Sequence, residues 1–237
     1  MRLCPPIGKE TGLTRSRFPT LPGAGIIRVM GGTDGLAPGL DLRDALGACA
    51  SVGHARVPAA IGTDTLRRLR AEIERNPFRP FGESFGQVRQ QIDGYDIPVP
   101  ASGFPVLTAL CHDLRHLVRS QGRGVRGLAT WVPNEVGVTH YVPGSIGITP
   151  HKDGKWYRRI VVVVTVYGRA PFAICGSRDP EDVVERWTSE PGGLVLMRGP
   201  GLAGARDGRP FHLVEGPRRG ERLSLGIRMS TRPAPGV

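Results

Sequence analysis

The tripeptide His151-Lys152-Asp153 and the distant His212 are the residues of this sequence best suited to bind a metal ion. In an extended strand, side chains at positions i and i+2 point to the same face, so His151 and Asp153 are predicted to converge on one point. His212 follows a strand-like run and a glycine-rich turn, where a third ligand from a distant strand is expected. Two imidazoles and one carboxylate suit Fe(II) and leave coordination positions open for other molecules.

Residues 222–228 alternate strictly between two kinds of side chain, which predicts a strand with an anion site on one face. The leucines and the isoleucine face an apolar core, and the other face carries Arg222, Ser224, Gly226 and Arg228. Two buried guanidinium groups require a counter-charge. An anion with a carboxylate at each end supplies it, and 2-oxoglutarate fits, with Gly226 leaving room for the ligand. The alternative is that both arginines lie on an exposed strand face.

The elements that position these residues are predicted from periodicity and turn residues. Short β-rich runs separated by Gly and Pro occur at 137–142, 160–167, 170–175, 193–197 and 222–229, after a short strand at 55–58. Apolar residues at helical spacing predict helices over 65–74, capped by Thr63-Asp64, and over 104–119 with Leu117 on the buried side. We therefore predict an α+β fold, mainly β, with a double-stranded β-helix (jelly-roll) core and helices packed on one face.

One domain with an irregular leader accounts for the whole sequence. Residues 1–40 are rich in Pro and Gly without sustained periodicity and predict a poorly ordered leader. Residues 41–126 form helical support and a lid segment of the same domain, and the lid is expected in the irregular stretch 77–105. Residues 127–232 form the jelly-roll core.

Together these residues resemble the AlkB-like branch of the Fe(II)/2-oxoglutarate-dependent dioxygenases. The stretch 139–144, Thr-His-Tyr-Val-Pro-Gly, is similar to the Asn-x-Tyr-x-Pro-Gly segment that precedes the HxD motif of that branch. The resemblance implies that His151, Asp153 and His212 bind Fe(II). It covers residues 127–230 well and residues 55–126 only in general layout.

The same resemblance implies how the co-substrate is held. Arg222 would grip the distal carboxylate of 2-oxoglutarate, Arg228 would lie near its keto-acid end, and Tyr141 would donate a hydrogen bond to it. Thr139 and Ser224 stand where the family has Asn, and both can still form hydrogen bonds. The implied activity consumes O2 and 2-oxoglutarate, releases succinate and CO2, and hydroxylates a C–H bond or removes an N-methyl group.

Three residues directly after the metal motif, Lys155, Trp156 and Tyr157, are candidates for substrate binding. They could stack on a base and contact phosphate, or form the mouth of a small-molecule pocket. Lys155 stands where DNA-repairing members of the family carry an acidic residue, which argues against repair of alkylated bases. The sequence leaves three functions open: a nucleic-acid demethylase, a hydroxylase or desaturase of a small metabolite, and a non-catalytic metal-binding barrel.

The composition restricts the class of protein less than the motifs do. The net charge of +11 favours polyanions such as nucleic acid, although the Gly-, Pro-, Arg- and Ala-rich composition produces the same balance without such a partner. No apolar run is long enough to cross a membrane, and there is no signal peptide, so a cytoplasmic monomer is expected. Four scattered cysteines predict reduced thiols. His112 and His116 are expected on a solvated helix face, and His140 is expected to point away from the metal.

Overall fold

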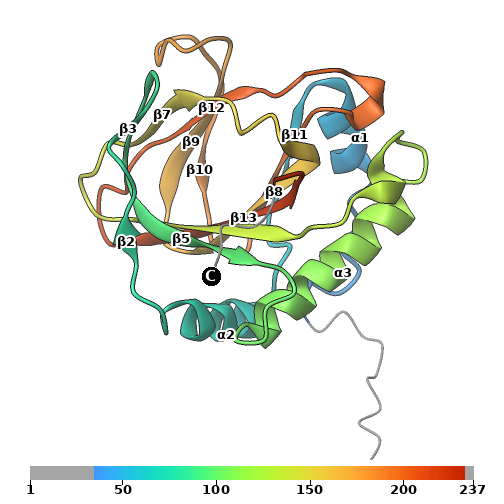
Figure 1. Cartoon of the computed structure of the whole chain (residues 1–237), viewed down its shortest axis with the longest axis horizontal. Helices are drawn as coiled ribbons and strands as arrows, with labels where there is room; N and C mark the ends of the chain where they lie inside the picture. The colour runs from blue at the N-terminus through green and yellow to red at the C-terminus, as the bar shows by residue number, and fades with distance from the viewer. Residues whose placement is uncertain (1–34, 233–237) are drawn as a thin grey trace, which may run out of the picture. The chain divides into compact units, whose positions relative to one another are not determined.

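Two antiparallel β-sheets and three α-helices make up residues 35–232, the part of the chain that the computed structural model describes (Figure 1). The 7-stranded sheet has the order β1 (His54–Val57), β11 (Leu194–Arg198), β8 (Tyr157–Tyr167), β13 (Arg222–Ser230), β6 (Glu135–Tyr141), β5 (Asp93–Pro98) and β2 (Arg79–Pro80). The 6-stranded sheet has the order β10 (Val183–Ser189), β9 (Ala170–Cys175), β12 (Phe211–Val214), β7 (Gly147–His151), β4 (Val88–Gln91) and β3 (Ser84–Phe85). The helices are α1 (Arg43–Ser51), α2 (Thr63–Ile73) and α3 (Pro105–Gln121). The predicted mainly-β jelly roll is confirmed.

The two faces of the 7-stranded sheet pack against different parts of the molecule. Along β8 and β13 every second residue, including Val162, Val164 and Leu225, belongs to the main apolar core with the helices. The residues between them face the other sheet, where Val161 packs with Phe172 of β9 in a smaller cluster. Because successive side chains of a strand alternate between faces, one strand can close the core and line the interior of the jelly roll at once.

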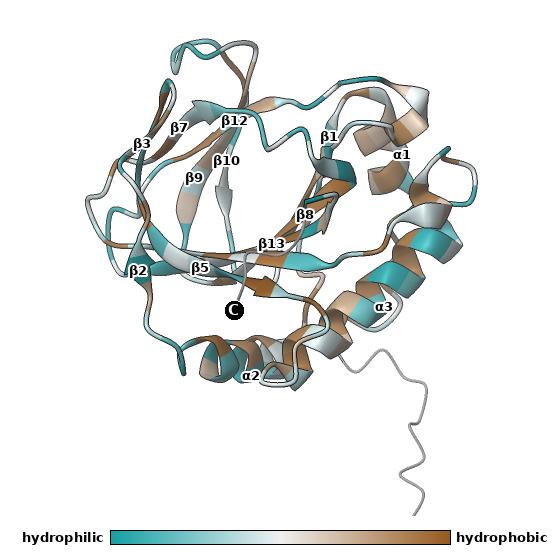
Figure 2. Ribbon diagram, in the orientation of Figure 1, coloured by the Kyte–Doolittle hydropathy of each residue, from teal (hydrophilic) through white to brown (hydrophobic). Residues whose placement is uncertain are grey.

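The helices cover the outer face of the 7-stranded sheet, and in Figure 2 α2 and α3 carry alternating teal and brown bands, as helices with one apolar side do. Leu69 and Ile73 of α2 and Leu110 and Leu114 of α3 are at most 1% exposed. Glu72 joins the two helices: its buried carboxylate accepts hydrogen bonds from the backbone N–H groups of residues 106 and 107, at 2.9 and 2.8 Å. A carboxylate is favourable there because these N–H groups begin α3 and have no partner within the helix.

The predicted elements after residue 127 lie within three residues of the observed strands, and 170–175 matches β9 at both ends. Helix α2 begins at Thr63, so Thr63 and Asp64 form its first turn and the backbone of Gly62 is the cap. Helix α3 buries Val118 completely, whereas Leu117 is only partly buried. An extended strand was expected at His151, where β7 ends, whereas β10 and β12 were not predicted as strands.

The prediction that residues 77–105 form an irregular loop is wrong. Four strands, β2 to β5, lie in this stretch, and β5 pairs with β6 along its whole length. Gly, Pro and Asp interrupt the apolar alternation of these strands, so pairing determines their conformation rather than local propensity: β5 pairs with β6 and β4 with β7, while β2 and β3 pair with β5 and β4.

The predicted leader and the predicted thiols can be placed only in part. Residues 1–34, with Cys4, lie outside the described residues. Leu36 forms an isolated β-bridge to Ile61 and is 5% exposed, so residues after 35 belong to the folded unit and not to a leader. The other three cysteines are buried free thiols. No helix among the described residues is both long and apolar enough to cross a membrane.

Replacing Glu72 with Ala should lower the free energy of unfolding by roughly 2–4 kcal/mol, because two buried N–H groups of α3 lose their acceptor. Glu74→Ala is the matched control, since Glu74 forms an exposed ion pair with Arg70 worth less than about 1 kcal/mol. Urea unfolding followed by circular dichroism measures both variants. Equal losses in the two would show that the capping contact is not a main stabilising interaction.

Candidate active site

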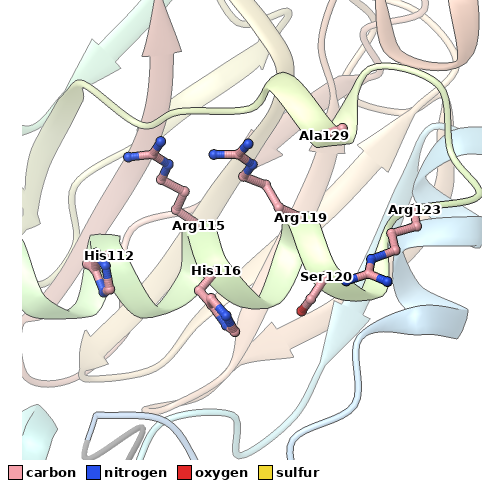
Figure 3. Close-up of a pocket in the computed structure, with 7 residues that line it drawn as sticks. All are labelled: His112, Arg115, His116, Arg119, Ser120, Arg123 and Ala129. Atoms are coloured by element: carbon pink, nitrogen blue, oxygen red, sulfur yellow. The ribbon is translucent and has the colours of Figure 1, made fainter. Parts of the chain in front are cut away.

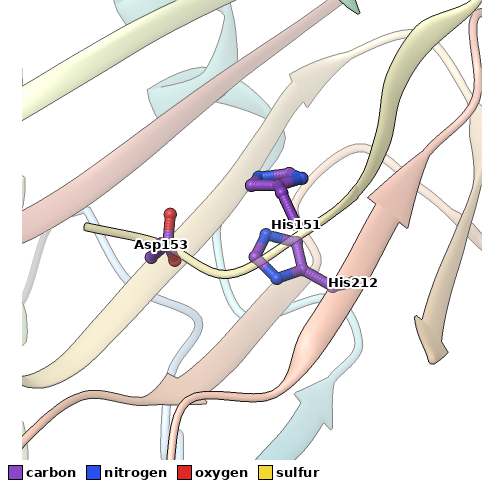
Figure 4. Close-up of side chains that lie close together, drawn as sticks. All are labelled: His151, Asp153 and His212. Atoms are coloured by element: carbon purple, nitrogen blue, oxygen red, sulfur yellow. The ribbon is translucent and has the colours of Figure 1, made fainter. Parts of the chain in front are cut away.

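His151, Asp153 and His212 lie together on the inner face of the 6-stranded sheet (Figure 4). His151 is the last residue of β7, and His212 of β12 pairs directly opposite it. Asp153 lies in the turn after β7 and not in the strand itself. The candidate ligand atoms of the three residues all lie within 4.8 Å of one another, and the two imidazole rings are 4.2 Å apart. The predicted convergence of these residues is therefore present in the structure.

The hydrogen bonds of the two histidines orient them as metal ligands. Nδ1 of His151 lies 2.9 Å from the carbonyl oxygen of Thr149, and Nδ1 of His212 lies 3.4 Å from that of Pro210. A carbonyl oxygen only accepts hydrogen bonds, so each Nδ1 carries the proton and each Nε2 keeps a free lone pair. Burial, and then the neighbouring His212, lowers the pKa of His151 to about 3. Two imidazoles beside a carboxylate fit Fe(II).

Arg209 holds the turn that carries Asp153, a role that sequence reasoning missed. Its guanidinium donates a hydrogen bond to the backbone carbonyl of Asp153 and forms a 2.6 Å ion pair with Asp207. The Arg209 side chain is 17% exposed, and its hydrogen bond lowers the pKa of Asp207 well below the usual range. Since Arg209 lies three residues before His212, its hydrogen bond connects the segment of Asp153 to the chain that leads into β12. The sequence shows that Asp207 and Arg209 are two residues apart, but it does not show the contact between Arg209 and the distant Asp153.

Arg222 is a fully buried cation on the inner face of the 7-stranded sheet. Its guanidinium donates hydrogen bonds to the hydroxyls of Ser189, Ser224 and Thr165 at 3.1, 3.1 and 3.3 Å, and it lies 4.9 Å from the ring of Tyr141. No carboxylate among residues 35–232 forms an ion pair with it. Burial lowers the pKa of Arg222, which reflects the cost of an uncompensated charge. An anion bound beside Arg222 would compensate this charge.

Arg228 has its counter-charges within the protein. Its Nη1 lies 3.0 Å from the hydroxyl of Tyr157, 3.4 Å from Glu135 and 3.6 Å from Asp96. Although burial alone would lower the pKa of Arg228, Tyr157 and the surrounding carboxylates raise it. The alternation of β13 predicts the same inward position for both arginines, but their charges differ in partners. Carboxylates of the protein neutralise Arg228, whereas none forms an ion pair with Arg222 among residues 35–232.

The expectation that Gly226 leaves room for a ligand is wrong, because Arg228 fills that space. A Cβ atom at Gly226 would lie 3.1 Å from the Arg228 guanidinium, and one at Gly137, directly opposite on β6, would lie 2.6 Å from it. The two glycines thus allow the guanidinium to lie against the sheet.

The remaining predicted co-substrate residues share the inner face with Arg222. Tyr141 lies opposite Arg222 and Thr139 lies opposite Ser224 in the β6–β13 pairing. Tyr141 is 2% exposed, and burial raises its pKa, so its hydroxyl keeps the proton that a hydrogen-bond donor needs. Thr139 is half-buried, and Ser224 is buried.

The predicted substrate residues have different surroundings. Lys155 is exposed, and Tyr157 contacts Arg228. The ring of Trp156 is covered by the guanidinium of Arg232 at 3.2 Å, so this face of the indole is not free to stack on a base.

The other histidines lie away from the three candidate ligands. His140 points to the opposite face of β6, where it stacks on Phe78 at 4.5 Å and lies 3.3 Å from Glu221. His112 and His116 are exposed on α3.

Solved structures share this fold. A Pseudomonas putida prolyl-4-hydroxylase is 19% identical with a TM-score of 0.55, and the match covers 80% of this chain and 98% of that one. A 2OG-Fe(II) oxygenase family oxidoreductase from Burkholderia pseudomallei is 16% identical with a TM-score of 0.59, covering 81% and 92%. OsALKBH1 is 16% identical with a TM-score of 0.52, covering 75% and 98%. No protein-family model and no curated protein matches the sequence. The fold is that of the 2OG-Fe(II) oxygenases, and no single branch stands out.

Replacing Arg209 with Ala should weaken Fe(II) binding roughly 10- to 100-fold, because the turn that carries Asp153 loses its brace. The matched control is Arg206→Ala, which removes an exposed arginine from the same loop. Anaerobic calorimetric titration with Fe(II) measures both, and His212→Ala should abolish binding. An unchanged affinity in Arg209→Ala would show that the turn holds Asp153 without it.

Proposed function

We propose that this protein is an Fe(II)- and 2-oxoglutarate-dependent dioxygenase. The observation that carries the proposal is the buried, uncompensated charge of Arg222 in the same interior as the two-histidine, one-carboxylate cluster. A metal-binding barrel without a co-substrate accounts for the cluster, but it leaves the cost of burying Arg222 unexplained. A dicarboxylate that binds the metal at one end and Arg222 at the other accounts for both.

The residues present fit this assignment in type and protonation. His151 and His212 would hold Fe(II) through Nε2, and Asp153 would hold it through a carboxylate oxygen. Arg222 would bind the distal carboxylate of 2-oxoglutarate with two hydrogen bonds, and Tyr141 would donate another. When bound, iron, 2-oxoglutarate and O2 supply the oxidising power to hydroxylate a substrate C–H bond with release of succinate and CO2.

The protein's own residues bind and orient the co-substrate. The hydroxyls of Ser189, Ser224 and Thr165 fix the guanidinium plane of Arg222 before the anion arrives. Arg228 interacts electrostatically with Asp153 across the two sheets, which supports its assignment to the keto-acid end of the co-substrate. Glu135 and Asp96 form ion pairs with Arg228, so its position does not depend on a bound anion.

Within this class, two kinds of substrate have support from separate observations. The order of the motifs resembles the AlkB-like branch, and together with the net charge of +11 it favours oxidative N-demethylation of a nucleic-acid base. The surroundings of the metal favour a second candidate, an anionic small metabolite, because exposed Lys155 and the Arg232 that covers Trp156 give cationic surroundings and no free indole face. Succinate release, measured with N-methylated oligonucleotides and with a panel of carboxylic acids, separates the two.

Replacing Arg222 with Met tests the co-substrate assignment through two opposite effects. Without ligand, the melting temperature should stay unchanged or rise, because the loss of three hydrogen bonds to hydroxyl groups is offset by removal of a buried charge. The rise in melting temperature that 2-oxoglutarate produces in the Fe(II)-loaded protein should disappear, with at least a 100-fold loss of affinity. Thermal unfolding under anaerobic conditions measures both.

Arg169→Met, which removes an exposed arginine, should keep the response to 2-oxoglutarate. If Arg222→Met responded like the wild type, the co-substrate assignment would be wrong and a metal-binding barrel would remain.

A further inference from the structure

The outward side of α3 carries two parallel rows of polar side chains that the metal site does not use. Arg115 and Arg119 lie four residues apart in one row, and His112, His116 and Ser120 form the neighbouring row; Arg123 lies two residues past the last residue of the helix, Gln121. Residues four apart lie on the same side of an α-helix. The opposite side of α3, with Leu110, Leu114 and Val118, is buried against the sheet and fixes which side faces outward.

These side chains line a groove, which we call the α3 groove. Its volume is about 530 Å3, and it is lined by His112, Arg115, His116, Arg119, Ser120, Arg123 and Ala129. Ala129 belongs to the short 3-10 helix Leu128–Thr130 beside α3. Figure 3 shows Arg115 and Arg119 projecting from α3 in the same direction, toward the segment that carries Ala129. Five of the seven lining residues are basic or can become cationic, and none is acidic.

The arginines of the α3 groove are not neutralised by the part of the chain described. None of Arg115, Arg119 and Arg123 forms an ion pair with a residue between 35 and 232, and the acidic neighbour of the groove is Asp113, 3.5 Å from His112. Helix α2 differs, since its Arg67 and Arg70 each pair with a carboxylate one turn away. Like charges four residues apart destabilise a helix, so the pair Arg115 and Arg119 carries a cost that a bound polyanion would remove.

We infer that the α3 groove binds the phosphodiester backbone of a nucleic acid. Four residues of α-helix advance about 6 Å, so Arg115 and Arg119 lie about that far apart along α3, and Arg123 adds a third guanidinium just past the end of the helix. Three neighbouring guanidinium groups suit the repeated charges of a nucleic-acid strand. Guanidinium groups bind phosphate oxygens with two hydrogen bonds, and the histidines and Ser120 add further donors. Contacts to phosphates position a nucleic acid without reading its sequence.

An anionic membrane surface fits the α3 groove less well than a nucleic acid does. Peripheral membrane binding needs apolar side chains that insert beside the cations, and the only apolar residue of the groove lining is Ala129. The groove lies on the outer, helix-covered side of the 7-stranded sheet, whereas the metal-binding cluster lies between the sheets. It is therefore a docking surface, and it does not depend on the proposed oxygenase activity.

The test compares two variants that each lose three positive charges. Arg115, Arg119 and Arg123 are replaced together by Gln in the groove variant. Arg68, Arg218 and Arg219, which are exposed and form no ion pair among residues 35–232, are replaced by Gln in the matched control. Fluorescence anisotropy with a labelled 20-nucleotide single-stranded DNA gives the affinity over a range of salt concentrations, and thermal unfolding confirms that both variants fold.

The wild type should bind with a strong salt dependence. In the groove variant the affinity should fall at least 10-fold, and the slope of log affinity against log salt should become shallower by about 2, since each phosphate that is no longer neutralised accounts for roughly 0.7. The control should change less than 3-fold. Equal losses in both variants, no binding by the wild type, or tight binding to phosphatidylserine vesicles without binding to DNA would each overturn the inference. Because Fe(II) and 2-oxoglutarate binding should be unchanged in the groove variant, failure here is distinct from failure of the proposed function.

Discussion

The interior of the jelly roll is organised around one constraint, the burial of the Arg222 charge. A fully buried guanidinium without a carboxylate partner is among the most expensive groups that a protein can hold. The structure lowers that cost with hydroxyls from three strands, Ser189 of β10, Thr165 of β8 and Ser224 of β13, and with the ring of Tyr141 from β6. Residues from both sheets thus converge on a group that contributes little to the stability of the empty protein. The proposed co-substrate would give this charge a partner of opposite sign.

The two faces of each strand divide the work between stability and chemistry. Leu223, Leu225 and Ile227 of β13 are completely buried in the core with the helices, and Arg222, Ser224 and Arg228 alternate with them toward the other sheet. A strand held on one face by such packing is a rigid support for polar groups on the other. The helices therefore matter to the site although they do not touch it, because they bury the outer face that fixes the orientation of β13.

The sequence sufficed for the parts of the site that follow from local periodicity. Alternation along β13 predicted which residues face inward, and the i, i+2 spacing predicted that His151 and Asp153 converge, although Asp153 lies beyond the end of β7. Pairwise contacts between distant segments were out of reach: nothing in the sequence shows that Glu135 and Asp96 neutralise Arg228, or that Arg209 contacts the turn of Asp153. The strands between residues 77 and 105 were missed for a similar reason. They are short and contain Gly and Pro, and pairing with β6 and β7 determines their conformation.

The metal-binding cluster depends on the register between β7 and β12 more than on any single contact. His212 faces inward with Val214, next to Phe172, whereas Phe211 and Leu213 pack on the outer side of the 6-stranded sheet against Ala173 and Cys175. A slip of one residue would turn every side chain of β12 to the other face and move His212 away from His151. Such a slip would also turn Phe211 and Leu213 into the interior and Val214 to the outer side of the sheet. The apolar pattern around His212 thus selects the register that places it opposite His151, and ordinary hydrophobic packing aligns the ligands before any metal binds.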